Sequence, residues 1–121
     1  PNVLGLVSVD TGLEVIEAAG IEAIRSKSIA LTEWASELCE SSICRKGWRI
    51  VSPPDPDSRG SHITVSGPHA KAVVGTMAAL GAIADFRLPD LIRLGLSPLT
   101  TTFAEVWDGI RILAEAIEAL S

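Results

Sequence analysis

The sequence feature that most constrains the fold is a short apolar segment between two prolines. Residues 91–96 read Leu-Ile-Arg-Leu-Gly-Leu, with Pro89 before them and Pro98 after them. The interval is too short for a helix, so it predicts a strand or another extended segment. Arg93 then lies in the middle of an apolar strand, where its guanidinium needs an anionic partner or access to solvent. If the fold supplies no carboxylate for Arg93, a ligand must supply one.

Apolar residues recur at helical spacing in four other stretches. The clearest begins at residue 21 and is expected to end at residues 45–47; its buried face would comprise Ile21, Ile24, Ser28, Leu31, Ala35 and Leu38. Residues 68–81 predict another helix, and the last helix begins at a cap on Thr101 or Thr102. Residues 3–19 are helical either from Asn2 onward or only from residues 10–12, and Gly20 is expected to end that helix.

The segments between the helices predict a small sheet. Residues 48–52, 63–65 and 83–88 are rich in β-forming side chains and join 91–96 as strands. A loop with three prolines separates the first two strands, which we expect to pair antiparallel. The order of elements predicts an α+β fold, a two-layer sandwich of a small, mainly antiparallel sheet with helices packed on one face. A length of 121 residues fits a single domain, 1–121.

Composition and charge exclude several classes of protein. A net charge of −5 without a Lys/Arg cluster argues against a nucleic-acid binder. The chain has no run of 18 apolar residues and does not open on a signal peptide, so we expect no membrane span and a cytoplasmic location. Cys39 and Cys44 are then expected to be free thiols. Because the chain begins at Pro1 without methionine, we expect it to be a processed or truncated piece.

No standard catalytic or metal-binding arrangement is visible in the residues themselves. His62 follows Ser61 directly, so the two side chains would point to opposite faces of a strand. His69 is expected at an exposed helix start. The two histidines and two cysteines are too scattered along the chain to match a zinc-binding motif, so the sequence argues against a zinc site. Spacing alone therefore indicates an α+β domain without a visible active site.

A longer pattern changes this interpretation. The run D-F-R-x-P-D-x-I-R-x-G-x-x-P-L at residues 85–99 follows R-G-S-H at residues 59–62. Their order and spacing resemble the C-terminal part of kynureninases, and the likeness extends from V-L-G-L at residue 3 to V-W-D-G-I at residue 106. Kynureninases are pyridoxal 5'-phosphate enzymes of tryptophan catabolism and NAD biosynthesis that hydrolyse kynurenine to anthranilate and alanine. The resemblance implies the small C-terminal domain of the aspartate-aminotransferase-like fold.

The resemblance also implies which groups this chain lacks. The lysine that holds the cofactor, the aspartate on its pyridine nitrogen and its phosphate-binding groups would belong to a large domain upstream. None of Lys27, Lys46 and Lys71 occupies the matching position, so we expect no catalytic and no cofactor-binding residue here. The expected partners are the large domain of the same enzyme, an amino-acid substrate and a second copy in a homodimer. The chain alone is expected to be inactive.

The substrate-binding residue implied by the resemblance is Arg93. It matches the arginine of the small domain that binds the α-carboxylate of the substrate, for which a guanidinium fork is suited. Arg59 is expected either to fix a loop or to line the site, and Arg87 to be structural, near Asp85 and Asp90.

Departures from the family pattern keep other functions open. Thr100 stands where relatives have tyrosine, and residues 66–68 read Ser-Gly-Pro where Arg-His-Pro is common. The alternatives are another aminotransferase-fold lyase, such as a cysteine-desulfurase relative, and a stand-alone binding or dimerisation module without catalysis. With 47% hydrophobic residues, the chain is also expected to expose an apolar patch that the large domain or a second subunit covers.

Overall fold

The computed structural model describes residues 2–121. Its α-helices are α1 (Val3–Ala19), α2 (Ile21–Ser42), α3 (Ala70–Ala79) and α4 (Phe103–Ala119). Its strands are β1 (Arg49–Ile50), β2 (His62–Ser66), β3 (Asp85–Arg87) and β4 (Leu91–Gly95). Short 3-10 turns follow α2 (Cys44–Lys46) and precede β2 (Pro56–Ser58).

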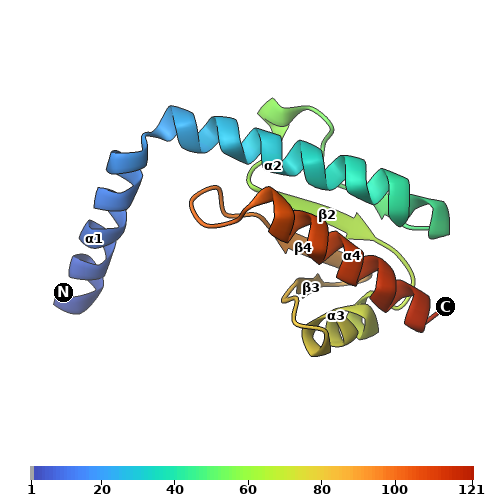
Figure 1. Ribbon diagram of the computed structural model, residues 1–121. Coiled ribbons are helices and arrows are strands. Elements are labelled where there is room, and N and C mark those ends of the chain that lie inside the picture. The colour runs from blue at the N-terminus through green and yellow to red at the C-terminus, as the bar shows by residue number, and fades with distance from the viewer. Residues whose placement is uncertain (1) are drawn as a thin grey trace.

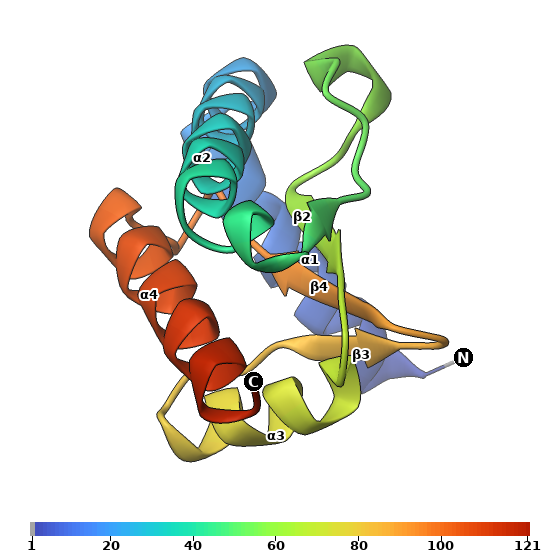
Figure 2. The same cartoon turned by 90° about the vertical axis from the view of Figure 1, so that its right-hand side faces the viewer.

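The four strands form one open antiparallel sheet in the order β1-β2-β4-β3. The predicted pairing of the first two strands is confirmed by the register, in which Ile50 lies opposite Val65. Helices α2, α3 and α4 lie on one side of the sheet, and no helix within residues 2–121 packs on its other face (Figure 2). Helix α1 extends away from these layers (Figure 1). The α+β prediction with helices on one face is therefore confirmed for this part of the chain.

The core is mainly aliphatic, includes Trp48, and lies between the sheet and the three helices. In β4, Ile92 and Leu94 are buried while Arg93 between them is partly exposed, as the alternation of a strand requires. Met77 on α3 is buried in this core. The largest fully buried side chains are Leu31, Ile43, Ile63, Met77, Ile92 and Leu113. Each contributes about 1.5–3 kcal/mol through removal of its apolar surface from water.

The strand predictions are right in place, but the predicted strands 48–52 and 83–88 are too long. The predicted strand 48–52 narrows to Arg49–Ile50 because the backbone N–H groups of Val51 and Ser52 both donate to the Thr64 carbonyl oxygen, at 2.8 and 3.4 Å. The Ser52 hydroxyl oxygen then accepts from the Thr64 N–H at 2.8 Å, so a side chain replaces the backbone ladder. The predicted strand 83–88 likewise narrows to Asp85–Arg87.

The helix boundaries follow from their caps. Asn2 accepts from the Gly5 N–H at 3.0 Å, so the first helix is the single long one of the two predicted alternatives. Helix α2 ends at Ser42, earlier than expected, and the chain turns at Gly47 with φ of 83°. Thr102, not Thr101, caps α4 in a reciprocal capping box with Glu105.

The predicted buried faces of α4 and α2 extend too far at their ends. Apolar residues at helical spacing predict a buried stripe on α4 from Phe103 to Leu120, but these two end residues are exposed. The stripe is buried only from Val106 to Ile117. Ile21 is likewise exposed at the start of α2. None of the helices within residues 2–121 combines the length and the apolar character needed to cross a bilayer.

Candidate substrate-binding site

Arg93 lies in the middle of β4 on the open face of the sheet. Its neighbours in the register are Thr64 on β2 and Asp85 on β3. The Arg93 Nη2 donates to Asp85 Oδ2 at 2.6 Å, so the fold does supply a carboxylate for this guanidinium. The side chain of Arg93 nevertheless remains 41% exposed, and no residue between 2 and 121 accepts a hydrogen bond from its Nε or Nη1. Two nitrogens of the guanidinium therefore have no hydrogen-bond partner among residues 2–121.

Asp85 is shared between two arginines. Its Oδ2 also accepts from Arg87 Nε at 2.8 Å, which agrees with the structural role predicted for Arg87. The hydrogen bond from Arg87 holds the pKa of Asp85 below its ordinary value, and the bond from Arg93 adds to this. Asp90, the other carboxylate expected near Arg87, instead accepts from the Ser66 hydroxyl at 2.9 Å. The Asp85 carboxylate that pairs with Arg93 is thus itself held by Arg87.

The role of Asp85 toward Arg93 was missed in the sequence. A signal for it exists, because the two residues are equally distant from Pro89 in a hairpin. Antiparallel strands joined by a tight turn bring such residues opposite each other. Together with Thr64 and His62 these side chains define a surface that we call the polar sheet face, made of His62, Thr64, Asp85, Arg87 and Arg93.

Arg59 is placed elsewhere, where it fixes a loop. Its side chain is only 5% exposed. The Nε donates to the Thr32 hydroxyl on α2 at 3.1 Å, and Nη1 donates to the Pro53 carbonyl at 3.3 Å and to that of Pro54. Nη2 is buried without a hydrogen bond, and Glu33 Oε1 lies 3.9 Å from it. Arg59 and Arg93 share no hydrogen-bond or ion-pair partner within residues 2–121, so the structure does not join the two predicted site residues in one polar network.

A second arginine supports the loop-fixing role of Arg59. Arg25 on α2 donates from Nη1 to the Arg59 carbonyl at 3.4 Å and from Nη2 to the Pro56 carbonyl. The loop between β1 and β2 therefore receives hydrogen bonds from the guanidinium groups of Arg25 and Arg59 in addition to its own turn bonds. Its prolines have no N–H to donate to a sheet ladder.

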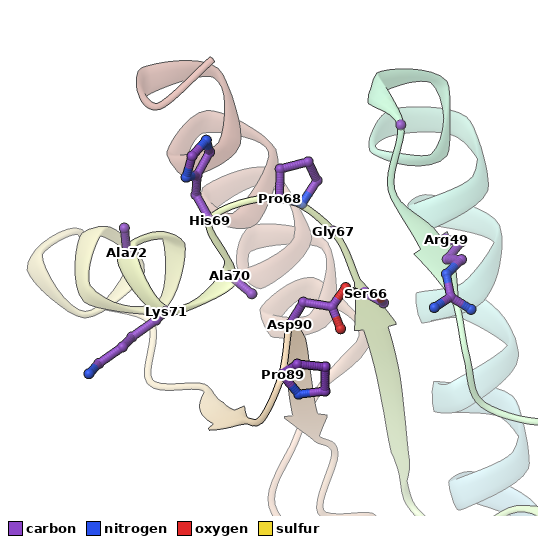
Figure 3. Close-up of a pocket in the computed structure, with 11 residues that line it drawn as sticks. Arg49, Ser66, Gly67, Pro68, His69, Ala70, Lys71, Ala72, Pro89 and Asp90 are labelled. Carbon is purple, nitrogen blue, oxygen red and sulfur yellow. Dashed lines mark hydrogen bonds between the residues drawn. The ribbon is translucent and has the colours of Figure 1, made fainter.

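A cavity of about 850 Å³ lies at the other end of β2 (Figure 3). Its lining includes a lysine and an aspartate, which are residue types that a pyridoxal phosphate site needs. Figure 3 shows the Lys71 side chain directed away from Asp90, whose carboxylate is bonded to Ser66. Of the other lysines, Lys46 pairs with Glu118 and Lys27 lies on α2. These side chains do not fit the cofactor.

The sulfur groups form no metal site. Cys39 and Cys44 are both free thiols, as predicted. Burial raises the pKa of Cys39 to about 12, and the charges of Cys44 and Glu40 add to this rise. Burial also raises the pKa of Cys44. Between residues 2 and 121 no three His, Cys, Asp or Glu side chains gather closely enough to hold a metal ion.

The two departures from the family pattern have different surroundings. Thr100 is exposed in the turn after β4, where its N–H donates to the Ser97 carbonyl at 3.2 Å. Gly67 is buried directly under the ring of Trp48, and a Cβ at this position would lie 2.1 Å from Trp48 Cδ2. The glycine is therefore needed for the close approach of the indole ring.

Comparison with known proteins decides the family. The family model described as "Kynureninase C-terminal domain" matches residues 24–113, which is most of the chain and includes Arg59, Asp85 and Arg93. The chain belongs to this family. The kynureninase of Pseudomonas fluorescens is 36% identical over 116 residues, which cover 96% of this chain and 28% of that protein. The kynureninase of Geobacillus thermodenitrificans (strain NG80-2) is 35% identical over 118 residues, which cover 98% and 28%.

A third relative, the kynureninase of Burkholderia mallei (strain SAVP1), is 34% identical over 116 residues, or 96% of this chain and 28% of the relative. The chain thus spans little more than a quarter of the length of the kynureninases it matches. The polar sheet face lies entirely within the part that the kynureninase C-terminal family defines.

Proposed function

We propose that this chain is the C-terminal domain of a kynureninase-like hydrolase that cleaves L-kynurenine to anthranilate and L-alanine. In this proposal Arg93 binds the α-carboxylate of the substrate. The observation that carries the proposal is the position of Arg93, on a helix-free sheet face with two nitrogens of its guanidinium unpaired within the described chain. Membership in the kynureninase C-terminal family supports the reaction class.

Asp85 would act as a positioning residue for Arg93. A planar guanidinium recognises a carboxylate through two parallel N–H···O bonds, so its orientation decides how well it binds. Asp85 holds Nη2 at 2.6 Å, and Arg87 holds Asp85 in turn at 2.8 Å. This chain of contacts limits rotation of the fork and leaves the opposite edge for a ligand.

The cofactor would be held by the rest of the protein. When bound, pyridoxal phosphate supplies the electron sink of the reaction. The contribution of this domain is to bind the carboxylate end of the substrate and to orient it. We also propose a cytoplasmic homodimer, and an isolated chain that is inactive. Release of anthranilate from kynurenine by the isolated chain with added pyridoxal phosphate would contradict the inactivity.

The experiment is steady-state kinetics on the complete protein with Arg93→Ala, Arg93→Lys and Arg87→Ala. Removal of a bidentate partner from a bound carboxylate costs about 2–5 kcal/mol, or about 30- to 5,000-fold in kcat/KM. We expect that loss for Arg93→Ala and partial recovery for Arg93→Lys, which keeps the charge without the fork.

Arg87→Ala is the matched control, because it also removes one bond to Asp85 but no proposed contact with substrate. We expect it to change kcat/KM much less than Arg93→Ala does. A normal kcat/KM in a stably folded Arg93→Ala protein would refute the proposed function. A lowered melting temperature with an unchanged KM would show that Arg93 is structural.

A further inference from the structure

Helix α1 has the surface of a buried helix but contacts little of this domain. None of its 17 residues is buried. Leu4 is 82% exposed and Leu6 63%, and further exposed apolar residues are Val3, Val7, Val9, Leu13, Val15 and Ile16. A surface helix of a globular protein shows one apolar stripe and a wide polar side, whereas a helix that is apolar nearly all round is buried.

The polar side of α1 is narrow. Its only charged residues, Asp10, Glu14 and Glu17, follow one another at intervals of four and three and so share one line along the helix. Away from this line the side chains are aliphatic or small. At Gly12 an added Cβ would meet nothing within 4 Å, so no part of the present structure packs against it. The apolar circumference therefore lacks its partner in this domain.

The match to the family model begins after α1. The kynureninase C-terminal family model begins at residue 24, beyond Gly20, where the chain turns with φ of 80°. The curated relatives, in contrast, match 96% of the chain, and 116 matched residues leave only five of 121 outside, so the match includes most of α1. Helix α1 is thus common to the longer kynureninases but lies outside the domain that the family model defines.

We propose that α1 belongs to the preceding domain of the complete protein, and that its apolar surface is buried against the polypeptide before residue 1. Gly20 would then be the boundary between the two domains, which would replace the single domain 1–121 expected from the sequence. Nearly three quarters of the length of each relative lies outside the matched part, enough chain to enclose a helix. The inference rests on the proposed function in one respect, namely that the complete protein is as long as the kynureninases it matches.

Other occupants fit the surface less well. Membrane-surface helices carry Lys and Arg on their polar side, but α1 has neither and its charged line is acidic. A second copy of the chain could bury one side of α1, yet a helix that is apolar nearly all round needs neighbours on several sides.

The first test uses Leu4→Lys and Val9→Lys, with Glu14→Lys on the acidic line as the matched control. In the 121-residue chain all three should unfold at the same temperature as the parent, because α1 buries no residue there. A lower melting temperature for Leu4→Lys or Val9→Lys would place α1 in the core of this domain and overturn the proposal.

In the complete protein, Leu4→Lys and Val9→Lys should lower the melting temperature more than the control Glu14→Lys does. We expect Val9→Lys to lower the melting temperature by at least about 5 °C, or to prevent folding, because a buried lysine would lack a partner. Glu14→Lys should leave it nearly unchanged. Equal melting temperatures of Val9→Lys and Glu14→Lys in the complete protein would refute burial of α1.

Hydrogen exchange on the unmodified complete protein keeps the test decisive if the variant does not fold. We expect α1 amides to exchange as slowly as those of α4, at every protein concentration. Fast exchange in α1, protection that disappears on dilution to monomers, or an intact mass near 12.7 kDa in the source cells would each overturn the proposal. The outcome is independent of Arg93, so failure of the proposed function would leave it unaffected.

Discussion

The substitution Gly67→Ala tests the packing around Trp48. Gly67 is buried between β2 and α3, under an indole ring that is itself in the core. A Cβ built on Gly67 would lie 2.1, 2.3 and 2.6 Å from Trp48 Cδ2, Cε2 and Cγ. These atoms belong to a rigid ring, so neither a bond rotation at the end of a flexible chain nor a small shift can relieve the clash.

The magnitude follows from the two ways in which the fold can respond. Moving the backbone to accommodate an added methyl group in a packed core costs about 1–3 kcal/mol. Expelling the ring would forfeit most of what a buried tryptophan contributes, which is about 3–5 kcal/mol for truncation to alanine. We therefore expect Gly67→Ala to lower the free energy of unfolding by about 2–4 kcal/mol.

The assay is urea unfolding of the 121-residue chain, followed by far-ultraviolet circular dichroism. The control is the pair Trp48→Leu and Trp48→Leu/Gly67→Ala, in which the smaller side chain leaves room for the new methyl group. We expect Gly67→Ala to cost much less in the Trp48→Leu background. A single Gly67→Ala protein within about 0.5 kcal/mol of the parent would refute the reasoning, since surface changes have effects of that size.

Three further predictions concern local features. At pH 8 iodoacetamide should modify Cys44 well before Cys39, because burial raises the pKa of Cys39 to about 12; equal rates measured by mass spectrometry would contradict the burial. Thr102→Ala should lower the free energy of unfolding by about 1 kcal/mol in urea denaturation through loss of the α4 cap, whereas an unchanged midpoint would show that the cap contributes nothing. Carbon NMR should show Asp85 titrating below its ordinary pKa, so its ion pairs persist at neutral pH and weaken as the pH falls through that lowered value. Arg87→Ala should raise this pKa, and an unchanged pKa in that variant would show that the hydrogen bond from Arg87 is not the main cause of the shift.

Most of the fold is predictable from the sequence because its signals are local. The prolines around residues 91–96 and the alternation of apolar residues are enough to place β4, with Arg93 in its middle. The helix starts are marked by Asn2 and Thr102, whose capping bonds form within three residues. Strand ends are less predictable, because β1 ends where a side chain, Ser52, takes over a backbone bond.

The contacts that the sequence did not predict are those between distant residues. Gly67 and Trp48 are far apart in the chain and meet only when β1 pairs with β2. Arg59 finds its acceptors on α2 and in a proline-rich loop, neither of which the R-G-S-H motif indicates. For Arg93 the sequence left open whether the fold supplies a carboxylate, and the register of the β3–β4 hairpin supplies Asp85.

The most direct test of the account compares L-kynurenine with its α-carboxamide as substrates of the complete protein. The wild-type protein should prefer the acid by about 30- to 5,000-fold in kcat/KM, the equivalent of about 2–5 kcal/mol. Arg93→Ala should reduce this preference to less than about 10-fold, because the group that distinguishes the two substrates is gone. Arg87→Ala should retain it. A preference in Arg93→Ala equal to that of the wild type would contradict the central claim that Arg93 binds the substrate carboxylate.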